Sequence, residues 1–134
     1  MTDETQDELP KILVADDDPA ICRLVKTIVE KEGYSVVTAR DGRDAYKILQ
    51  SDGSFAAAIF DVVMPYIQGT ELVRYMQSER RLMKIPVIVM TAEQNPRLSS
   101  ESFAAGAVAF LPKPFTTAQL QTMLKMFVRK NQDA

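Results

Sequence analysis

The chain has 134 residues and a formal net charge of −2, with 46% hydrophobic and 25% charged residues, values typical of a single globular domain. This balance excludes a strongly basic nucleic-acid binder, and no apolar run is long enough to span a bilayer, so we expect a cytoplasmic protein without nucleic-acid or membrane contacts. The absence of histidine excludes histidine-based triads and zinc sites within the chain, and the single cysteine, Cys22, excludes an internal disulfide.

Five short apolar runs separated by helical patterns are predicted to be buried strands. The residues before the first run are polar and acidic, and we expect residues 1–9 to be a disordered acidic leader. Residues 10–130 are expected to form one domain, followed by a polar tail over residues 131–134. The predicted strands are 11–15, 35–39, 56–60, 87–90 and 108–111.

A helical pattern follows each predicted strand. Two of the helices begin with a capping residue followed by proline, which suits the first helical position. The last helix is expected to bury Leu120, Met123, Leu124 and Phe127, and the charged run 79–81 is expected to be a solvated helix end. The predicted helix starts are Asp18-Pro19, Asp41, a position near Thr70, Asn95-Pro96, and Thr116 or Thr117.

Strand and helix therefore alternate five times along the chain. This alternation predicts an α/β fold with a doubly wound, five-stranded parallel sheet, helices on both faces and right-handed crossovers. In open sheets of this kind, ligands bind beyond the carboxyl ends of the strands. Functional side chains are therefore expected at those positions.

Polar side chains follow four of the predicted strands. Asp16 and Asp17 follow the first, Asp61 the third and Thr91 the fourth, and Lys113 comes shortly after the fifth. If these strands are neighbours, the side chains converge on one pocket. Two carboxylates about 4 Å apart repel by roughly 4 kcal/mol at an effective dielectric near 20, so the cluster favours a bound cation. The sequence predicts an acidic metal site with one lysine beside it.

Four sequence motifs coincide with these strand ends. They are Ile-Leu-Val-Ala-Asp-Asp-Asp-Pro at 12–19, Phe-Asp-Val-Val-Met-Pro at 60–65, Thr-Ala-Glu at 91–93, and Ala-Phe-Leu-Pro-Lys-Pro-Phe at 109–115. With these motifs in this order, the chain resembles the receiver domain of two-component response regulators. The resemblance implies a flavodoxin-like fold with strand order 2-1-3-4-5.

The resemblance also implies a function. Asp61 would accept a phosphoryl group from the phosphohistidine of a sensor histidine kinase or a histidine phosphotransfer protein. Asp16, Asp17 and Asp61, with the backbone carbonyl of Val63, would hold Mg²⁺, which Mn²⁺ could replace. The domain would be a phosphoacceptor signalling module that catalyses only its own phosphorylation and dephosphorylation.

Further roles follow from the same resemblance. Thr91 and Lys113 would contact the phosphoryl oxygens, and Thr91 and Phe110 would form a conformational switch. Phe110 also lies in a predicted strand, where a buried core ring is an alternative to a moving one. The Lys113-Pro114 peptide bond is a candidate cis bond.

The predicted output is contact with a protein partner through the face formed by the fourth helix, fifth strand and fifth helix. Relatives that act as transcription factors often dimerise there through paired charges, but the stretch 106–110 has no acidic residue. Some of those pairs could not form, although Arg97, Glu101, Lys125 and Arg129 are present on the helices. Small and apolar residues such as Ala104, Ala109 and Phe110 are expected on this face instead. We expect a monomer or weak dimer.

Other functions are compatible with parts of the pattern. A flavin-binding protein would need a phosphate loop rich in glycine, serine or threonine after the first strand, where this chain has Asp-Asp-Asp-Pro. A Mg²⁺-dependent aspartyl-phosphate phosphatase of the haloacid-dehalogenase type would use an Asp-x-Asp pattern, which Asp16 and Asp18 match, although the chain is short for an independent hydrolase. A receiver-like binding module that is not phosphorylated is a third alternative, which the intact acids and Lys113 disfavour.

Overall fold

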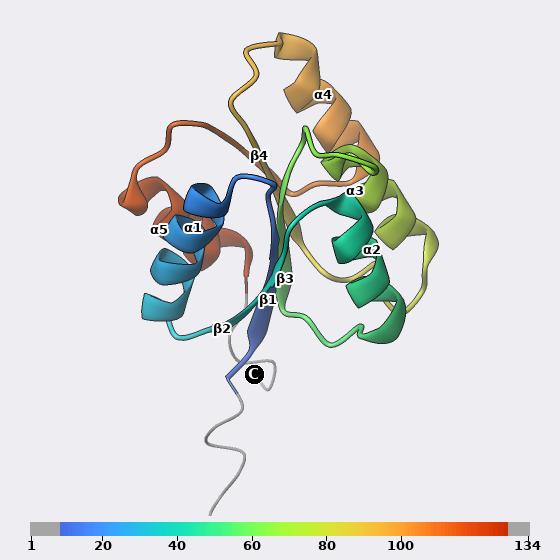
Figure 1. Ribbon diagram of the computed structural model, residues 1–134, viewed down its shortest axis with the longest axis horizontal. Coiled ribbons are helices and arrows are strands. Elements are labelled where there is room, and N and C mark those ends of the chain that lie inside the picture. The colour runs from blue at the N-terminus through green and yellow to red at the C-terminus, as the bar shows by residue number, and fades with distance from the viewer. Residues whose placement is uncertain (1–8, 129–134) are drawn as a thin grey trace, which may run out of the picture.

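The computed structural model describes residues 9–128 (Figure 1). The predicted leader apart from Leu9, the predicted tail and Arg129 lie outside this range. The elements are β1 (Lys11–Ala15), α1 (Pro19–Lys31), β2 (Ser35–Ala39), α2 (Gly42–Ser51), β3 (Ala57–Asp61), α3 (Gly69–Ser78), β4 (Val87–Thr91), α4 (Pro96–Ala105), β5 (Ala109–Pro112) and α5 (Thr117–Phe127).

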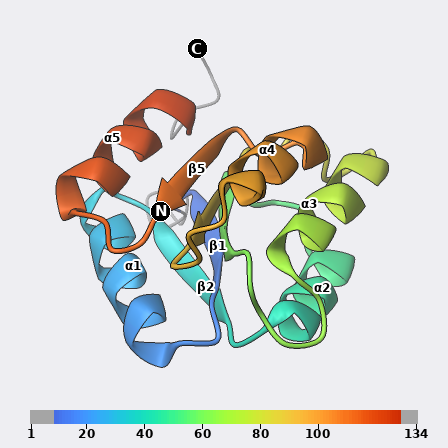
Figure 2. The ribbon, with the colours of Figure 1, turned by 90° about the horizontal axis from the view of Figure 1, so that it is seen from above.

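The strands form one five-stranded sheet in the order β2-β1-β3-β4-β5, and every neighbouring pair is parallel. Helices α1 and α5 cover one face, and α2, α3 and α4 cover the other (Figures 1 and 2). Both the predicted fold class and the strand order are confirmed. None of the helices described between residues 9 and 128 has the length and apolar character that a membrane span requires.

The core has two halves, one on each face of the sheet. In β1, Leu13 and Ala15 pack with the helices α2 to α4, while Ile12 and Val14 pack with α1 and α5. This alternation follows from the two-residue period of a strand. Every residue of β3 and β4 is buried, and each fully buried Ile, Leu or Phe contributes about 1.5–3 kcal/mol through the hydrophobic effect. The packing therefore fixes the strands whose ends carry the polar residues.

Local capping interactions start the helices where the sequence predicts. The Asp18 carboxylate accepts a hydrogen bond from the Ala20 N–H at 2.9 Å, and the Asn95 side chain accepts one from the Arg97 N–H at 3.0 Å. Thr116 caps α5. Such side chains satisfy backbone N–H groups that have no partner in the first helical turn.

The structure corrects several details of the predicted elements. Strand β3 begins at Ala57, one residue later than expected. Strands β3 and β4 each end one residue later than expected, because the ladders pair Asp61 with Met90 and Thr91 with Pro112. Strand β5 begins at Ala109, one residue later than expected.

Phe127 is 37% exposed rather than inward. Two residues of α5, Leu120 and Leu124, are buried, four positions apart. Phe127 lies on the same helical face, seven residues after the first of them, but it is the last residue of α5, where the helix ends.

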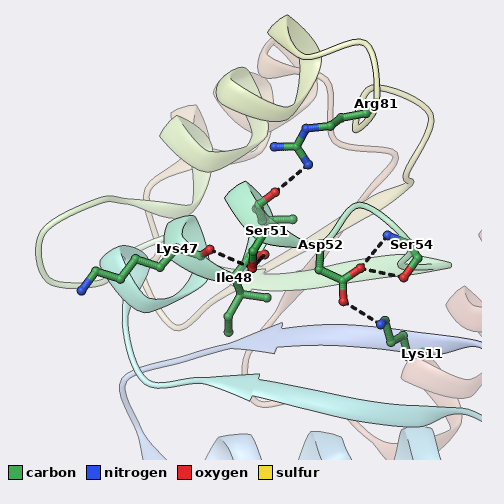
Figure 3. A network of polar contacts seen from close by, with 8 residues as sticks. Lys11, Lys47, Ile48, Ser51, Asp52, Ser54 and Arg81 are labelled. Atoms are coloured by element: carbon green, nitrogen blue, oxygen red, sulfur yellow. Dashed lines mark hydrogen bonds and ion pairs between the residues drawn. The ribbon is translucent and has the colours of Figure 1, made fainter.

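The charged run 79–81 is not simply a solvated helix end (Figure 3). Arg81 Nη1 donates to the Leu49 carbonyl at 2.8 Å, and Nη2 approaches the Gln50 carbonyl at 3.4 Å. These carbonyls lie in the last turn of α2, where backbone oxygens lack helical partners and attract cations. The arginine therefore ties the α3–β4 connection to a neighbouring helix, a contact that helical spacing alone does not reveal.

A second polar contact lies close by. Lys11 Nζ is 2.6 Å from Asp52 Oδ2, and Ser54 donates to the other carboxylate oxygen (Figure 3). The hydrogen bonds from Lys11 and Ser54 lower the pKa of Asp52 to about 2. This pair joins β1 to the end of α2, at the edge of the sheet opposite the acidic cluster.

Candidate functional site

The carboxyl ends of the strands lie along the upper edge of the sheet in Figure 1. Strands β1 and β3 are neighbours, and their register pairs Ala15 with Phe60. The next residue on each strand is an aspartate, so Asp16 and Asp61 are brought together by the sheet. One carboxylate oxygen from each of Asp16, Asp17 and Asp61 lies within 4.8 Å of the others. The structure thus assembles the three acids that the sequence singled out.

Asp16 is held in place by two hydrogen bonds. It is 2% exposed; its Oδ1 accepts from the Asp18 N–H at 2.9 Å, and its Oδ2 accepts from Lys113 Nζ at 2.8 Å. Each carboxylate oxygen has a further lone pair, so both can still bind a cation. Asp17, in contrast, is exposed. The cluster therefore combines two buried acids with one that is open to solvent.

Lys113 directly follows β5, the outermost strand of the sheet on the side of β4. Its backbone N–H donates to the Thr91 carbonyl at 2.8 Å, and the Lys113-Pro114 peptide bond is cis. The Lys113 side chain is 11% exposed, and its Nζ lies 3.6 Å from Asp61 Oδ2. One ammonium is thus shared by two buried carboxylates.

Asp61 lies in an environment that disfavours its charge. Burial, followed by the negative charge of Asp16, raises the pKa of Asp61 to about 6, although Lys113 opposes the shift. Three carboxylates and one ammonium leave an excess of negative charge in the cluster. Carboxylates are also the ligands that Mg²⁺ prefers. By charge and by ligand chemistry, the site fits a divalent cation.

The loop between β3 and α3 forms the rim beside Asp61. The Val63 side chain is 45% exposed, and within residues 9–128 no hydrogen bond reaches the Val63 carbonyl oxygen. The Gly69 N–H closes the loop on the Val62 carbonyl at 2.9 Å. A Cβ at Gly69 would overlap the Asp61 carbonyl. This role of Gly69 is not among the expectations from the sequence, although a glycine that opens a helix is a signal of close backbone approach.

Thr91 and Phe110 are neighbours at the other side of the site. Thr91 is 2% exposed, and its hydroxyl oxygen accepts a hydrogen bond from the Glu93 N–H at 3.0 Å. The hydroxyl proton is left to be donated elsewhere. Phe110 is partly buried and borders two hollows, one of about 280 Å³ beside Thr91 and one of about 560 Å³ along β5 and α5.

Asp18 follows Asp17 in the sequence but is not part of the acidic cluster. Its side chain caps α1 and is exposed. The Asp-x-Asp pattern of Asp16 and Asp18 therefore does not place both carboxylates in one pocket. This arrangement does not favour a haloacid-dehalogenase-type phosphatase.

The order of the parallel strands defines a flavodoxin-like α/β protein, and the acids at the carboxyl edge of its sheet form a cluster that fits a cation. A family model of the response regulator receiver domain matches residues 12–125. The chain therefore belongs to the response regulator receiver domain family of two-component systems.

Curated relatives agree with this assignment. Response regulator MprA of Mycolicibacterium vanbaalenii is 34% identical over 120 residues, covering 90% of this chain and 51% of the relative. Transcriptional regulatory protein CpxR of Escherichia coli (strain K12) is 32% identical over 121 residues, covering 90% of this chain and 50% of the relative. The chain thus spans about half the length of these relatives.

Solved structures show the same fold. The chemotaxis response regulator CheY4 of Vibrio cholerae has a TM-score of 0.80 and 33% identity, covering 88% of this chain and 98% of that one. A CheY-like receiver domain protein from Methanospirillum hungatei JF-1 has a TM-score of 0.80 and 32% identity, with coverages of 88% and 92%. Receiver domains are signalling domains, and they generally bind Mg²⁺.

Proposed function

We propose that residues 10–130 form a cytoplasmic phosphoacceptor domain in which Asp61 takes a phosphoryl group from a phosphohistidine. The donor would be a sensor histidine kinase or a histidine phosphotransfer protein. The observation that carries this proposal is the buried Asp61 carboxylate, flanked by two acids and approached by Lys113 at 3.6 Å. A carboxylate is a nucleophile that forms covalent phosphoryl intermediates.

In the proposed reaction, an Asp61 carboxylate oxygen attacks the phosphorus in line with the leaving nitrogen. A P–O bond forms, the P–N bond breaks, and the donor's imidazole leaves. Phosphoryl transfer depends chiefly on positioning and on compensation of charge on the equatorial oxygens. The Lys113 ammonium and the Thr91 hydroxyl would supply part of that compensation.

Asp16, Asp17 and Asp61, with the Val63 carbonyl, would hold the divalent cation, Mg²⁺ or Mn²⁺. When bound, the cation would neutralise the excess negative charge that otherwise opposes entry of an anionic phosphoryl group. The role of Asp16 would be twofold, because the same carboxylate also orients Lys113 through the 2.8 Å ion pair.

The proposed switch couples Thr91 to Phe110. A phosphoryl group on Asp61 is a new acceptor for the Thr91 hydroxyl, and Thr91 would move toward it. Phe110 borders the hollow beside Thr91 and the groove along β5 and α5, so a rotation of its ring would fill one space and enlarge the other. The phosphoryl group shifts the balance only by its differential affinity for the two states.

The proposed output surface is the face formed by α4, β5 and α5. Its groove of about 560 Å³ is lined by Phe103, Val108 and Met126, which are 49%, 37% and 67% exposed. Ala109, expected on this face from the sequence, is buried at 4% exposure. An apolar groove suits a partner protein better than nucleic acid, and we propose a monomer or weak dimer.

The test is incubation with a small-molecule phosphodonor and Mg²⁺, followed by intact mass measurement. Wild type should gain one phosphoryl group, and Asp61→Asn should gain none. Asp52→Asn is a matched control, because Asp52 lies at the opposite edge of the sheet with Lys11. Equal labelling of Asp61→Asn and wild type would rule out Asp61 as the acceptor and favour a binding module that is not phosphorylated.

A further inference from the structure

The loop between β3 and α3 contains a tyrosine in an unusual backbone conformation. Tyr66 has a φ of 73°, the only positive φ of a non-glycine residue within residues 9–128. The Ile67 N–H donates to the Pro65 carbonyl at 2.9 Å and closes a three-residue γ-turn around Tyr66. Residues with a Cβ rarely adopt a positive φ, and such a conformation persists only where surrounding contacts stabilise it.

Two contacts from the start of α2 hold this turn. The guanidinium carbon of Arg43 lies 3.9 Å from the centroid of the Tyr66 ring. Gly42 approaches the Ile67 carbonyl so closely that a Cβ on the glycine would overlap it. Tyr66 is 66% exposed, so burial in the core does not hold its ring. The stacked guanidinium is the contact that fixes it, through cation–π attraction.

The same loop carries the carbonyl proposed as a cation ligand. Val63 lies between the base of the loop, where the Gly69 N–H donates to the Val62 carbonyl, and the γ-turn at Tyr66. Met64 is 5% exposed and packs in the core between them. With the base and the core side fixed, the γ-turn is the remaining part of the loop that is able to move.

We propose that Arg43 is a positioning residue. By stacking on Tyr66, it holds the β3–α3 loop, and with it the Val63 carbonyl, in the conformation that binds the divalent cation. We call this pair the Arg43–Tyr66 clasp. This inference rests on the proposed function, because the cation site is part of that function. Arg43 would act on the cation site through Tyr66, without entering the site.

The clasp makes a prediction opposite in sign to that of simple electrostatics. A positive charge on α2 repels a divalent cation, so its removal alone would tighten Mg²⁺ binding. The clasp instead predicts weaker binding when Arg43 loses its charge. Lys47, one turn further along α2, extends away from its neighbours in Figure 3 and provides a charge-matched control.

The experiment compares Arg43→Gln, Tyr66→Leu, the double variant and Lys47→Gln with wild type. The Mg²⁺ dissociation constant is measured by NMR titration with the metal alone, and hydrogen exchange of the Ile67 amide is measured without metal. Each clasp variant should raise the dissociation constant and the exchange rate by about two- to five-fold, the range expected for an exposed cation–π contact. The double variant should lose no more than either single one, and Lys47→Gln should show no loss.

Equal or tighter Mg²⁺ binding by Arg43→Gln overturns the clasp, as do additive losses in the double variant. A wild-type protein that binds no Mg²⁺ overturns the cation site of the proposed function, and the role of Arg43 in cation binding falls with it. The two failures are distinguishable, because in the first the wild type still binds the metal.

Discussion

Lys113 makes its short ion pair with Asp16, at 2.8 Å, although 97 positions separate the two residues in the chain. Asp61 lies further from the same ammonium, at 3.6 Å. The lysine is therefore a structural partner of one acid and a neighbour of the other. In this arrangement its ammonium partly compensates the charge of both buried carboxylates.

Replacement of Lys113 should destabilise the protein. Lys113→Met leaves the buried Asp16 and Asp61 without their cation, and breaking a buried ion pair in this way costs about 3 kcal/mol. The free energy of unfolding, measured in urea at pH 7 without divalent cations, should fall by about this amount. In an Asp16→Asn background the loss should be smaller. Lys11→Met, which breaks a half-exposed pair, should cost less than about 1 kcal/mol, and equal losses in the two variants would contradict the argument.

Asp61 should make stability depend on pH. Its pKa in the folded protein, about 6, is above the ordinary value of 3.8. The stability that this shift contributes is therefore fully present below pH 3.8 and is lost as the pH rises through about 6. Asp61→Asn should be more stable than wild type at pH 7 by up to about 3 kcal/mol, with a much smaller gain near pH 4. Denaturant titrations in the presence of a chelator would measure the free energy of unfolding at each pH. A gain that does not change with pH would contradict the raised pKa of Asp61.

Asp17 should matter for cation binding and little for stability. Its side chain is exposed, so Asp17→Asn should change the free energy of unfolding by less than about 0.5 kcal/mol without metal. It removes a charged ligand of the kind Mg²⁺ prefers, so the Mg²⁺ dissociation constant should rise at least about ten-fold. Asp44→Asn is a control for the loss of one acidic charge. An unchanged dissociation constant in Asp17→Asn would remove this residue from the cation site.

Thr91 and Phe110 should change together. Beryllofluoride, a phosphoryl mimic, is expected to draw the Thr91 hydroxyl toward Asp61 and to turn the Phe110 ring toward the hollow beside Thr91. Thr91→Val keeps the shape of the side chain but removes the hydroxyl, so the ring should not turn. Crystal structures with and without the mimic would test both statements. Identical rotamers in the two states would show that Phe110 is a core ring and not a switch.

The lifetime of the proposed acyl phosphate should depend on Val63. Hydrolysis needs a water placed in line with the phosphorus, and the exposed Val63 side chain offers it no hydrogen bond. In the Val63→Asn variant, the asparagine amide can hydrogen-bond that water. In the wild-type protein, Glu93 is the residue that can hold the water, and it does so only in part. We expect Val63→Asn to lose its phosphoryl group several-fold faster than wild type. This effect is smaller than that of a positioned general acid or base, because the asparagine only orients the water and takes no proton from it. Decay that is no faster than in wild type, followed by intact mass, would disprove the role of this position.

Local signals in the sequence determined much of this protein. Apolar runs bounded by polar residues predicted the strands, and Asp18, Asn95 and Thr116 marked helix starts because capping acts over a few residues. The alternation of elements then implied the parallel sheet, and the strand order implied by the family resemblance made the strands before Asp16 and Asp61 neighbours. These inferences succeed because strand period, capping and crossover handedness depend on neighbouring residues or on general rules of packing.

Only the tertiary structure decided how the side chains share their partners. The closer pairing of Lys113 with Asp16, the contact of Arg81 with the end of α2, and the exposure of Phe127 each depend on where distant elements come to lie. The same holds for Tyr66, whose positive φ accompanies a ring contact with Arg43. The physical reason is that ion pairs, hydrogen bonds and ring contacts are short-ranged and directional, so shifts of a few ångströms between packed elements decide which of several suitable partners a side chain meets.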